Sequence, residues 1–143
     1  MLTAEVLDSI GGLASHIKVY AAKLPSIVHL KAVPSGVKPS AEAIEQYETI
    51  VFRTRTRSVG TPYKTLNESF ILSLEAFEIG NLIGAVHPLL AILDHLERME
   101  RDQEIEAGRL DDKRLKEYRA ALRKVLPGNQ PELEGTGGGM DKL

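Results

Sequence analysis

The sequence predicts an all-α fold, a bundle of about five helices, and the spacing of its apolar residues is the main support for this prediction. Apolar residues recur at spacings of three and four along most of residues 1–126, which is the period of an amphipathic helix. The longest uncharged stretch, 79–93, is shorter than the roughly 18 to 20 apolar residues that a membrane span needs. The chain has no Cys, so disulfides and thiolate metal sites are excluded. The predicted helices are 3–24, 41–57, 66–86, 88–107 and 111–126.

The first helix, 3–24, has its apolar residues on one stripe and ends before Pro25. Gly11 and Gly12 lie inside it, and two glycines in a helix cost on the order of 1 to 2 kcal/mol relative to alanine. We therefore expect a bend or a close contact with another helix at this point. The stripe consists of Val6, Ile10, Leu13, Ile17, Tyr20 and Leu24.

The second helix, 41–57, follows a connector at 25–39 that is punctuated by prolines, and Ser40 is its expected N-cap. Its end is open to two interpretations, because 50–59 is rich in β-branched residues and could form a small β-hairpin with 27–33. The helix is favoured, because residues 40–52 already follow the 3.6-residue period of a helix.

The third and fourth helices, 66–86 and 88–107, are expected to meet at Pro88, which suits the first turn of a helix, although a kinked continuation through Pro88 is equally allowed. Thr65 and Glu68 match the capping box that begins a helix. The third helix is apolar on nearly every side, so it must be buried on several sides. Four amphipathic helices of modest length do not obviously provide that much cover, and this shortage is the main reason to expect a partner.

The last helix, 111–126, has Asp111 in its first turn and basic residues in its last turns, as the helix dipole favours. Gly108 is the expected residue after the end of the fourth helix. A short link then makes the two helices an antiparallel hairpin, and its polar part, 97–126, is expected to project outward. Charge changes sign along this region: 65–108 has two basic and nine acidic side chains, and 109–126 has seven and three.

These elements indicate a single helical domain at 1–126, followed by a flexible, glycine-rich tail at 127–143 that would serve as an attachment arm. The start of the chain has Glu5 and Asp8 before any lysine, which is not the pattern of a signal peptide. We expect a protein of the cytoplasm or of an assembled particle, not one secreted through a signal peptide.

No motif of catalytic or cofactor chemistry is present. The chain lacks the nucleophile elbow and both glycine-rich phosphate loops. Glu75 and Glu78 are not accompanied by the Glu-x-x-His pairs of di-metal bundles, and a helix would hold His87 and His95 too far apart for one ion. We therefore predict no catalytic residue, no cofactor, no metal site and no enzyme activity.

The function expected from the sequence is that of a structural or adaptor subunit. It would form a homo-oligomer or dock on a protein partner, as small helical subunits of large assemblies do, phage particles included. Membrane contact is not expected, because Glu75 and Glu78 would be costly in hydrocarbon. Small residues spaced by four allow helices to approach closely. The predicted interface consists of Ala76, Gly80, Gly84, Ile83, Leu89 and Leu90.

The alternative function is nucleic-acid binding through a basic segment, in which Arg and Lys side chains would contact phosphates. As a helix, this segment pairs Arg53 with Arg57 and turns Arg55 away, whereas a strand would place all three on one face. The same cations could equally form a solvated edge or pair with the acidic residues of 97–106. The proposed phosphate contacts are Arg53, Arg55, Arg57 and Lys64.

Overall fold

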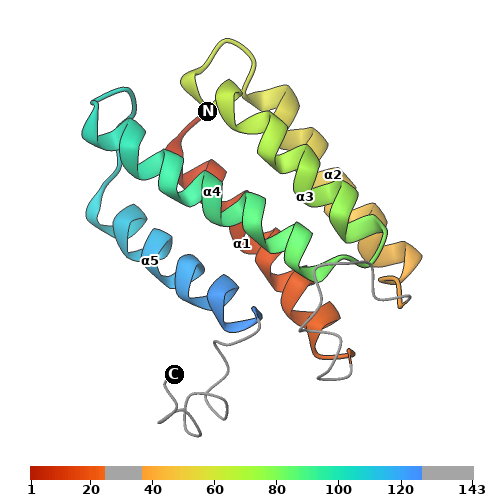
Figure 1. The fold of residues 1–143 in the computed structure, drawn as a ribbon. Helices are drawn as coiled ribbons and strands as arrows, with labels where there is room; N and C mark the ends of the chain where they lie inside the picture. The colour runs from red at the N-terminus through yellow and green to blue at the C-terminus, as the bar shows by residue number, and fades with distance from the viewer. Residues whose placement is uncertain (25–36, 127–143) are drawn as a thin grey trace, which may run out of the picture.

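The structure, a computed structural model, describes residues 1–24 and 37–126, and these ranges contain no strand. The all-α prediction is therefore confirmed for them. α1 and α4 lie in the middle of the bundle, with α2 and α3 on one side and α5 on the other (Figure 1). The elements are α1 (Thr3–Ala21), α2 (Ala41–Arg57), the 3₁₀ helix η2 (Pro62–Leu66), α3 (Asn67–Glu78), α4 (Leu82–Arg101) and α5 (Arg109–Lys124).

α2 has the predicted bounds, and Ser40 caps it by accepting a hydrogen bond from the Ala43 N–H at 3.1 Å. The helix continues through the β-branched segment, so a strand at 50–59 is wrong. The threonines there tolerate the helix because each hydroxyl donates to the carbonyl four residues earlier. The other strand of the expected hairpin, 27–33, lies outside the described residues.

The break between the third and fourth helices lies at 79–81, not at Pro88, which is inside α4. Gly80 has a φ of 76°, the left-handed conformation that commonly ends a helix at glycine. Asn81 then caps α4 by accepting a hydrogen bond from the Gly84 N–H at 2.9 Å. These two local signals outweigh the preference of proline for a first turn.

The predicted capping box does not form. The Thr65 hydroxyl donates to the Pro62 carbonyl at 3.1 Å, and Thr61 caps η2 instead, by accepting from the Tyr63 N–H at 3.2 Å. α3 follows η2 directly and has no side-chain cap. The preceding 3₁₀ turn replaces the cap, because its carbonyls already accept hydrogen bonds at the junction.

The link between α4 and α5 starts earlier than predicted, because α4 ends at Arg101. Gln103 takes the left-handed conformation after the helix, with a φ of 63°. Gly108, expected at this position, instead immediately precedes α5, and its N–H donates to the Asp111 carboxylate at 3.1 Å. The prediction that acidic residues begin the last helix is confirmed.

All five helices contribute to one hydrophobic core. The apolar side of α4 is covered by α1, α3 and α5 of the same chain, so the shortage of cover expected from the sequence does not arise on α4. The uncharged run 79–93 begins at the turn between α3 and α4. This turn folds the first part of α4 back against α3, which helps to bury the run. The buried side chains of α4 are Leu82, Ala85, Val86, Leu89, Ile92, Leu93, Leu96 and Met99.

The two glycines of α1 lie at close helix contacts, as predicted. A Cβ atom at Gly11 would lie 2.6 Å from the Tyr118 hydroxyl of α5, and one at Gly12 would lie 3.0 Å from Ile50 of α2. Both neighbouring helices can thus approach α1 more closely than a larger residue would permit.

α4 and α5 form the predicted antiparallel hairpin, but the hairpin does not project outward. α5 lies along α1 as well as α4 (Figure 1). Arg114 binds Asp8 of α1 at 2.5 Å, while Arg119 binds Asp94 and Glu97 of α4 at 2.9 and 2.5 Å. Opposite charges therefore hold α5 on both neighbours.

Candidate functional site

The predicted small-residue interface forms the corner between α3 and α4. A Cβ atom at Gly84 would lie 3.0 Å from the Ala76 Cβ and 2.7 Å from the Asn81 side chain. Gly80 is buried in the turn between the helices. The small residues thus permit close packing inside one chain, and they do not form a ridge on one helix.

The larger members of the predicted interface also belong to this chain's own packing. Leu89 has no exposed surface, and Ile83 and Leu90 are half-buried. Leu90 packs on the edge of the core. Leu89 therefore offers no free apolar face.

The basic segment is exposed, but it does not form one basic face. Arg53 and Arg57 share the side of α2 that faces α1, as the helical interpretation predicts, and Arg55 points elsewhere. Arg57 forms an ion pair with Glu5. Lys64 lies on η2, beyond the end of α2.

A shallow hollow of ≈ 250 Å³ lies between α1 and α2, and both arginines line it. The Leu2 N–H and, after it, the Arg57 guanidinium hold the pKa of the Glu5 carboxyl below its usual range, so this carboxylate is ionised at neutral pH. An incoming phosphate would meet a cation that is already neutralised. The lining residues are Met1, Glu5, Asp8, Ser9, Arg53, Thr54 and Arg57.

A second hollow, of ≈ 560 Å³, lies between α4 and α5 and is mainly acidic. Partial burial and the neighbouring Asp112 carboxyl raise the pKa of Glu100. No group of three or more side chains in 1–24 and 37–126 is arranged to hold a metal ion. The lining residues are Glu97, Glu100, Arg101, Asp112, Leu115 and Lys116.

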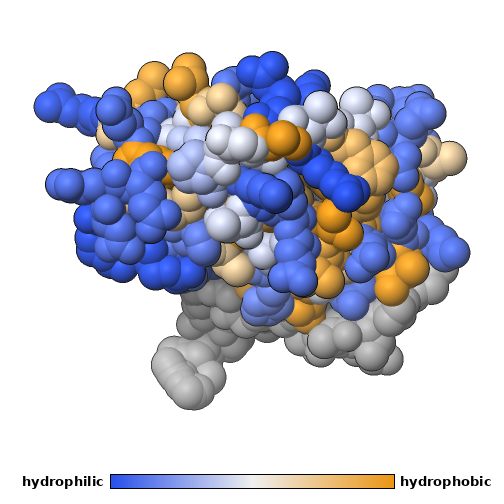
Figure 2. All heavy atoms as spheres, turned by 90° about the horizontal axis from the view of Figure 1, so that it is seen from above, coloured by the Kyte–Doolittle hydropathy of each residue, from blue (hydrophilic) through white to orange (hydrophobic). Residues whose placement is uncertain are grey.

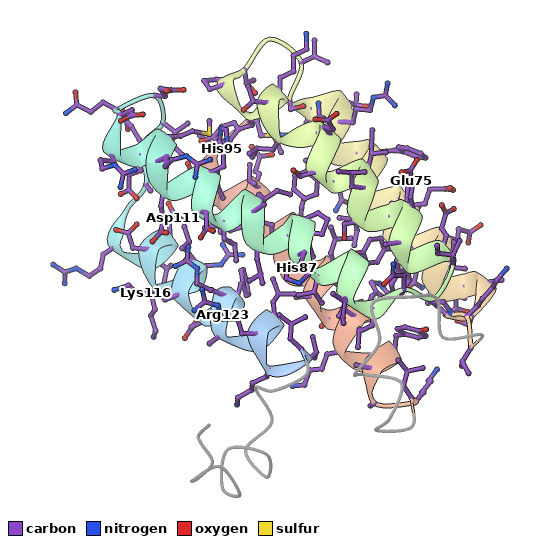
Figure 3. The ribbon with its side chains drawn as sticks, in the orientation of Figure 1. Glu75, His87, His95, Asp111, Lys116 and Arg123 are labelled. Atoms are coloured by element: carbon purple, nitrogen blue, oxygen red, sulfur yellow. The ribbon has the colours of Figure 1, made fainter. Side chains whose placement is uncertain are left out.

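The histidines and Glu75 do not converge on a site. Figure 3 shows Glu75 on α3, and His87 and His95 well separated along α4. His87 is exposed. His95 lies within 3.4 Å of the Thr65 hydroxyl on η2 and 3.2 Å of the Arg98 guanidinium on its own helix.

The outer surface of α2 and α3 carries apolar side chains that the sequence patterns did not single out. Phe52 is 43% exposed, Leu72 52% and Ile79 47%. Leu72 lies on α3, and Ile79, seven positions later, is the residue that directly follows this helix. The available signal was that Phe52 and Leu72 fall outside the apolar stripes of their helices.

α2 and α3 run antiparallel and in a fixed register. Hydrogen bonds at both ends of the pair set that register. Figure 2, which looks onto the molecule from above the view of Figure 1, shows hydrophobic side chains lying among hydrophilic ones. The register-setting pairs are Tyr47 with Ser73 at 2.6 Å and Asn67 with Ser58 at 3.0 Å.

Comparison with known proteins gives no relative: no family model, curated protein or solved structure matches this chain. Among the helices of the described ranges, none combines the length and the apolar character that crossing a membrane requires. The outer α2–α3 face, made of Phe52, Leu72 and Ile79, is therefore our candidate functional site.

Proposed function

We propose that the protein is a non-enzymatic helical subunit that self-associates or docks into a larger protein assembly through its outer α2–α3 face. The observation that supports this proposal is the exposure of Phe52, Leu72 and Ile79 on that face. Covering a large apolar side chain contributes about 1.5 to 3 kcal/mol when the burial is complete. Three half-exposed side chains on neighbouring helices therefore provide a substantial part of the free energy of binding.

The other exposed apolar residues are distributed differently. Leu2, Val19, Val37, Val59 and Leu110 lie on the N-terminus, α1, the segment before α2, the loop after α2, and α5. Single apolar residues of this kind are normal on a protein surface and need no partner. This contrast is why the proposal assigns binding to α2 and α3.

The test is the mass of the native particle, measured by sedimentation for the purified full chain and by crosslinking in a lysate of its source. We expect a particle larger than one chain in at least one of these settings. Leu72→Glu should remove it, and the control Leu110→Glu should preserve it. A single-chain mass in both settings, or a particle unaffected by Leu72→Glu, would contradict the proposal.

Nucleic-acid binding remains the second candidate because Arg53, Arg55, Arg57 and Lys64 are all exposed. Glu5 beside Arg57 weighs against it. A salt titration with duplex DNA and with RNA separates the two functions, since phosphate contacts make affinity fall steeply with salt. No binding at low salt would exclude this candidate.

A further inference from the structure

The exposed face of α2 is divided by charge into two halves. The acidic residues Glu42, Glu45 and Glu48 lie in the N-terminal half of the helix, and its basic residues lie in the C-terminal half. Glu45, Thr49 and Arg53 are spaced by four and are all exposed, so they follow one line along the helix, and the Arg53 end of this line also borders the hollow beside α1. Thr49 is the midpoint of that line.

Within the described ranges, these charges are largely unneutralised. Glu42 contacts only the neutral Gln46 amide, at 3.4 Å, and neither Glu45 nor Arg53 is part of an ion pair. This differs from α5, whose Arg114 and Arg119 both bind carboxylates of neighbouring helices. α2 also lies on the opposite side of the bundle from α5 (Figure 1).

We propose that a second copy of this chain covers this face, with the two α2 helices antiparallel about a two-fold axis near Thr49. The axis places the acidic half of each helix beside the basic half of the other, so the favourable contact between Glu45 and Arg53 occurs twice. A parallel arrangement would set like charges against each other. The inference rests on the proposed function, because it names the partner for the α2 part of the same face.

The centre of the face can be covered without an unpaired polar group. The Thr49 hydroxyl already donates to the Glu45 carbonyl at 2.9 Å, so losing water costs it little. Phe52 lies one turn away and is 43% exposed. The Phe52 ring would pack beside the two-fold axis. Because each copy contributes one such ring, the dimer would contain two.

The size of the surface sets the expected strength. A helix of 17 residues is about 25 Å long, and one such helix pair covers less than the ~800 Å² per partner of a standard stable interface. The dimer should therefore be reversible, with monomer and dimer exchanging as the concentration of the purified chain changes.

The test is a charge exchange between Glu45 and Arg53, read by sedimentation equilibrium of the full chain. Glu45→Arg alone and Arg53→Glu alone each place like charges together twice and should weaken the dimer by about tenfold or more. An equimolar mixture of the two variants should restore dimers, because each contact then joins opposite charges. Arg55→Glu makes the same charge change away from this face and should leave the dimer unchanged.

Circular dichroism of each variant separates lost association from lost folding. The inference is overturned if the mixture associates no better than the single variants, or if both single variants dimerise like the native chain. If Leu72→Glu removes an assembly that the charge variants leave intact, the outer face binds protein but the α2 pair is wrong. If neither kind of variant changes the particle mass, both the inference and the proposed function fail.

Discussion

Ser73→Ala should destabilise the protein more than the small change in size suggests, because the Ser73 hydroxyl is bonded on both sides inside the core. Tyr47 and Ser73 each have 0% exposure. The Ser73 hydroxyl donates its only proton to the Ala85 carbonyl at 2.7 Å, so at the 2.6 Å contact the Tyr47 hydroxyl must be the donor. Burial raises the pKa of the Tyr47 phenol, which keeps that proton in place.

The expected cost follows from which groups lose a partner. Ser73→Ala leaves the buried Tyr47 O–H unpaired, which costs about 1 to 3 kcal/mol. Tyr47→Phe leaves Ser73 bonded to Ala85 and costs about 0.5 to 1.5 kcal/mol. The double variant removes the donor together with its acceptor, so it should cost about 1 kcal/mol less than the sum of the single variants.

Urea unfolding of the native chain, the two single variants and the double variant measures this difference, provided that the m-value is the same for all four proteins. Ser69→Ala is a matched control on α3, since Ser69 is half-buried, and should stay within about 0.5 kcal/mol of the native chain. Additivity of Tyr47→Phe and Ser73→Ala to within about 0.5 kcal/mol would refute the hydrogen-bond reasoning.

Three further predictions concern α1, α4 and α5. Gly11→Ala should destabilise the native chain, because its Cβ would lie 2.6 Å from the Tyr118 hydroxyl. In a Tyr118→Ala background the same change should stabilise the protein by up to about 1 kcal/mol through helix propensity. Urea unfolding measures both effects, and a change of stability with the same sign in both backgrounds would contradict this contact. The pKa of Glu100 is raised in the folded state, so its contribution to stability is full below the unfolded pKa and is lost as pH rises through the folded pKa. Glu100→Gln should therefore increase the urea midpoint at pH 7 and have a smaller effect near pH 4, and an equal effect at both pH values would refute the assignment. Arg119→Met should cost about 1 kcal/mol and increase amide exchange throughout α5, since Arg119 joins α5 to two carboxylates of α4; unchanged exchange would show that these ion pairs do not hold the helix.

Helices that depend on strong periodicity were predicted from the sequence. α2 has the predicted bounds because Ser40 caps it and its apolar residues keep a 3.6-residue period. The contacts at Gly11 and Gly12 were also predictable, because two glycines in an apolar stripe need a packing reason.

The break between α3 and α4 was misplaced because one strong signal was given too much weight. Pro88 favours a first turn but tolerates a helix interior when the surrounding packing holds the helix. Gly80 followed by Asn81 is itself a helix stop followed by a cap, and this pair would have located the break. Interpreting Gly80 as a small residue for helix packing concealed its role in the turn.

The candidate site could not be predicted from local patterns. Phe52 and Leu72 are 20 positions apart in the sequence, and their exposure depends on how α2 and α3 pack in the bundle. Likewise, the contact of Arg114 with Asp8 joins the two ends of the domain. Contacts of this kind depend on tertiary packing. The helix period and the capping residues predict single helices, and they do not predict which helices pack together.

Self-association through α2 is tested most directly by sedimentation equilibrium of the purified full chain, from micromolar to near-millimolar concentration. We predict that the average mass rises with concentration from 15.7 kDa toward twice that value, and that an equimolar mixture of Glu45→Arg and Arg53→Glu chains shows the same rise. A mass that stays at one chain over the whole range would contradict this account.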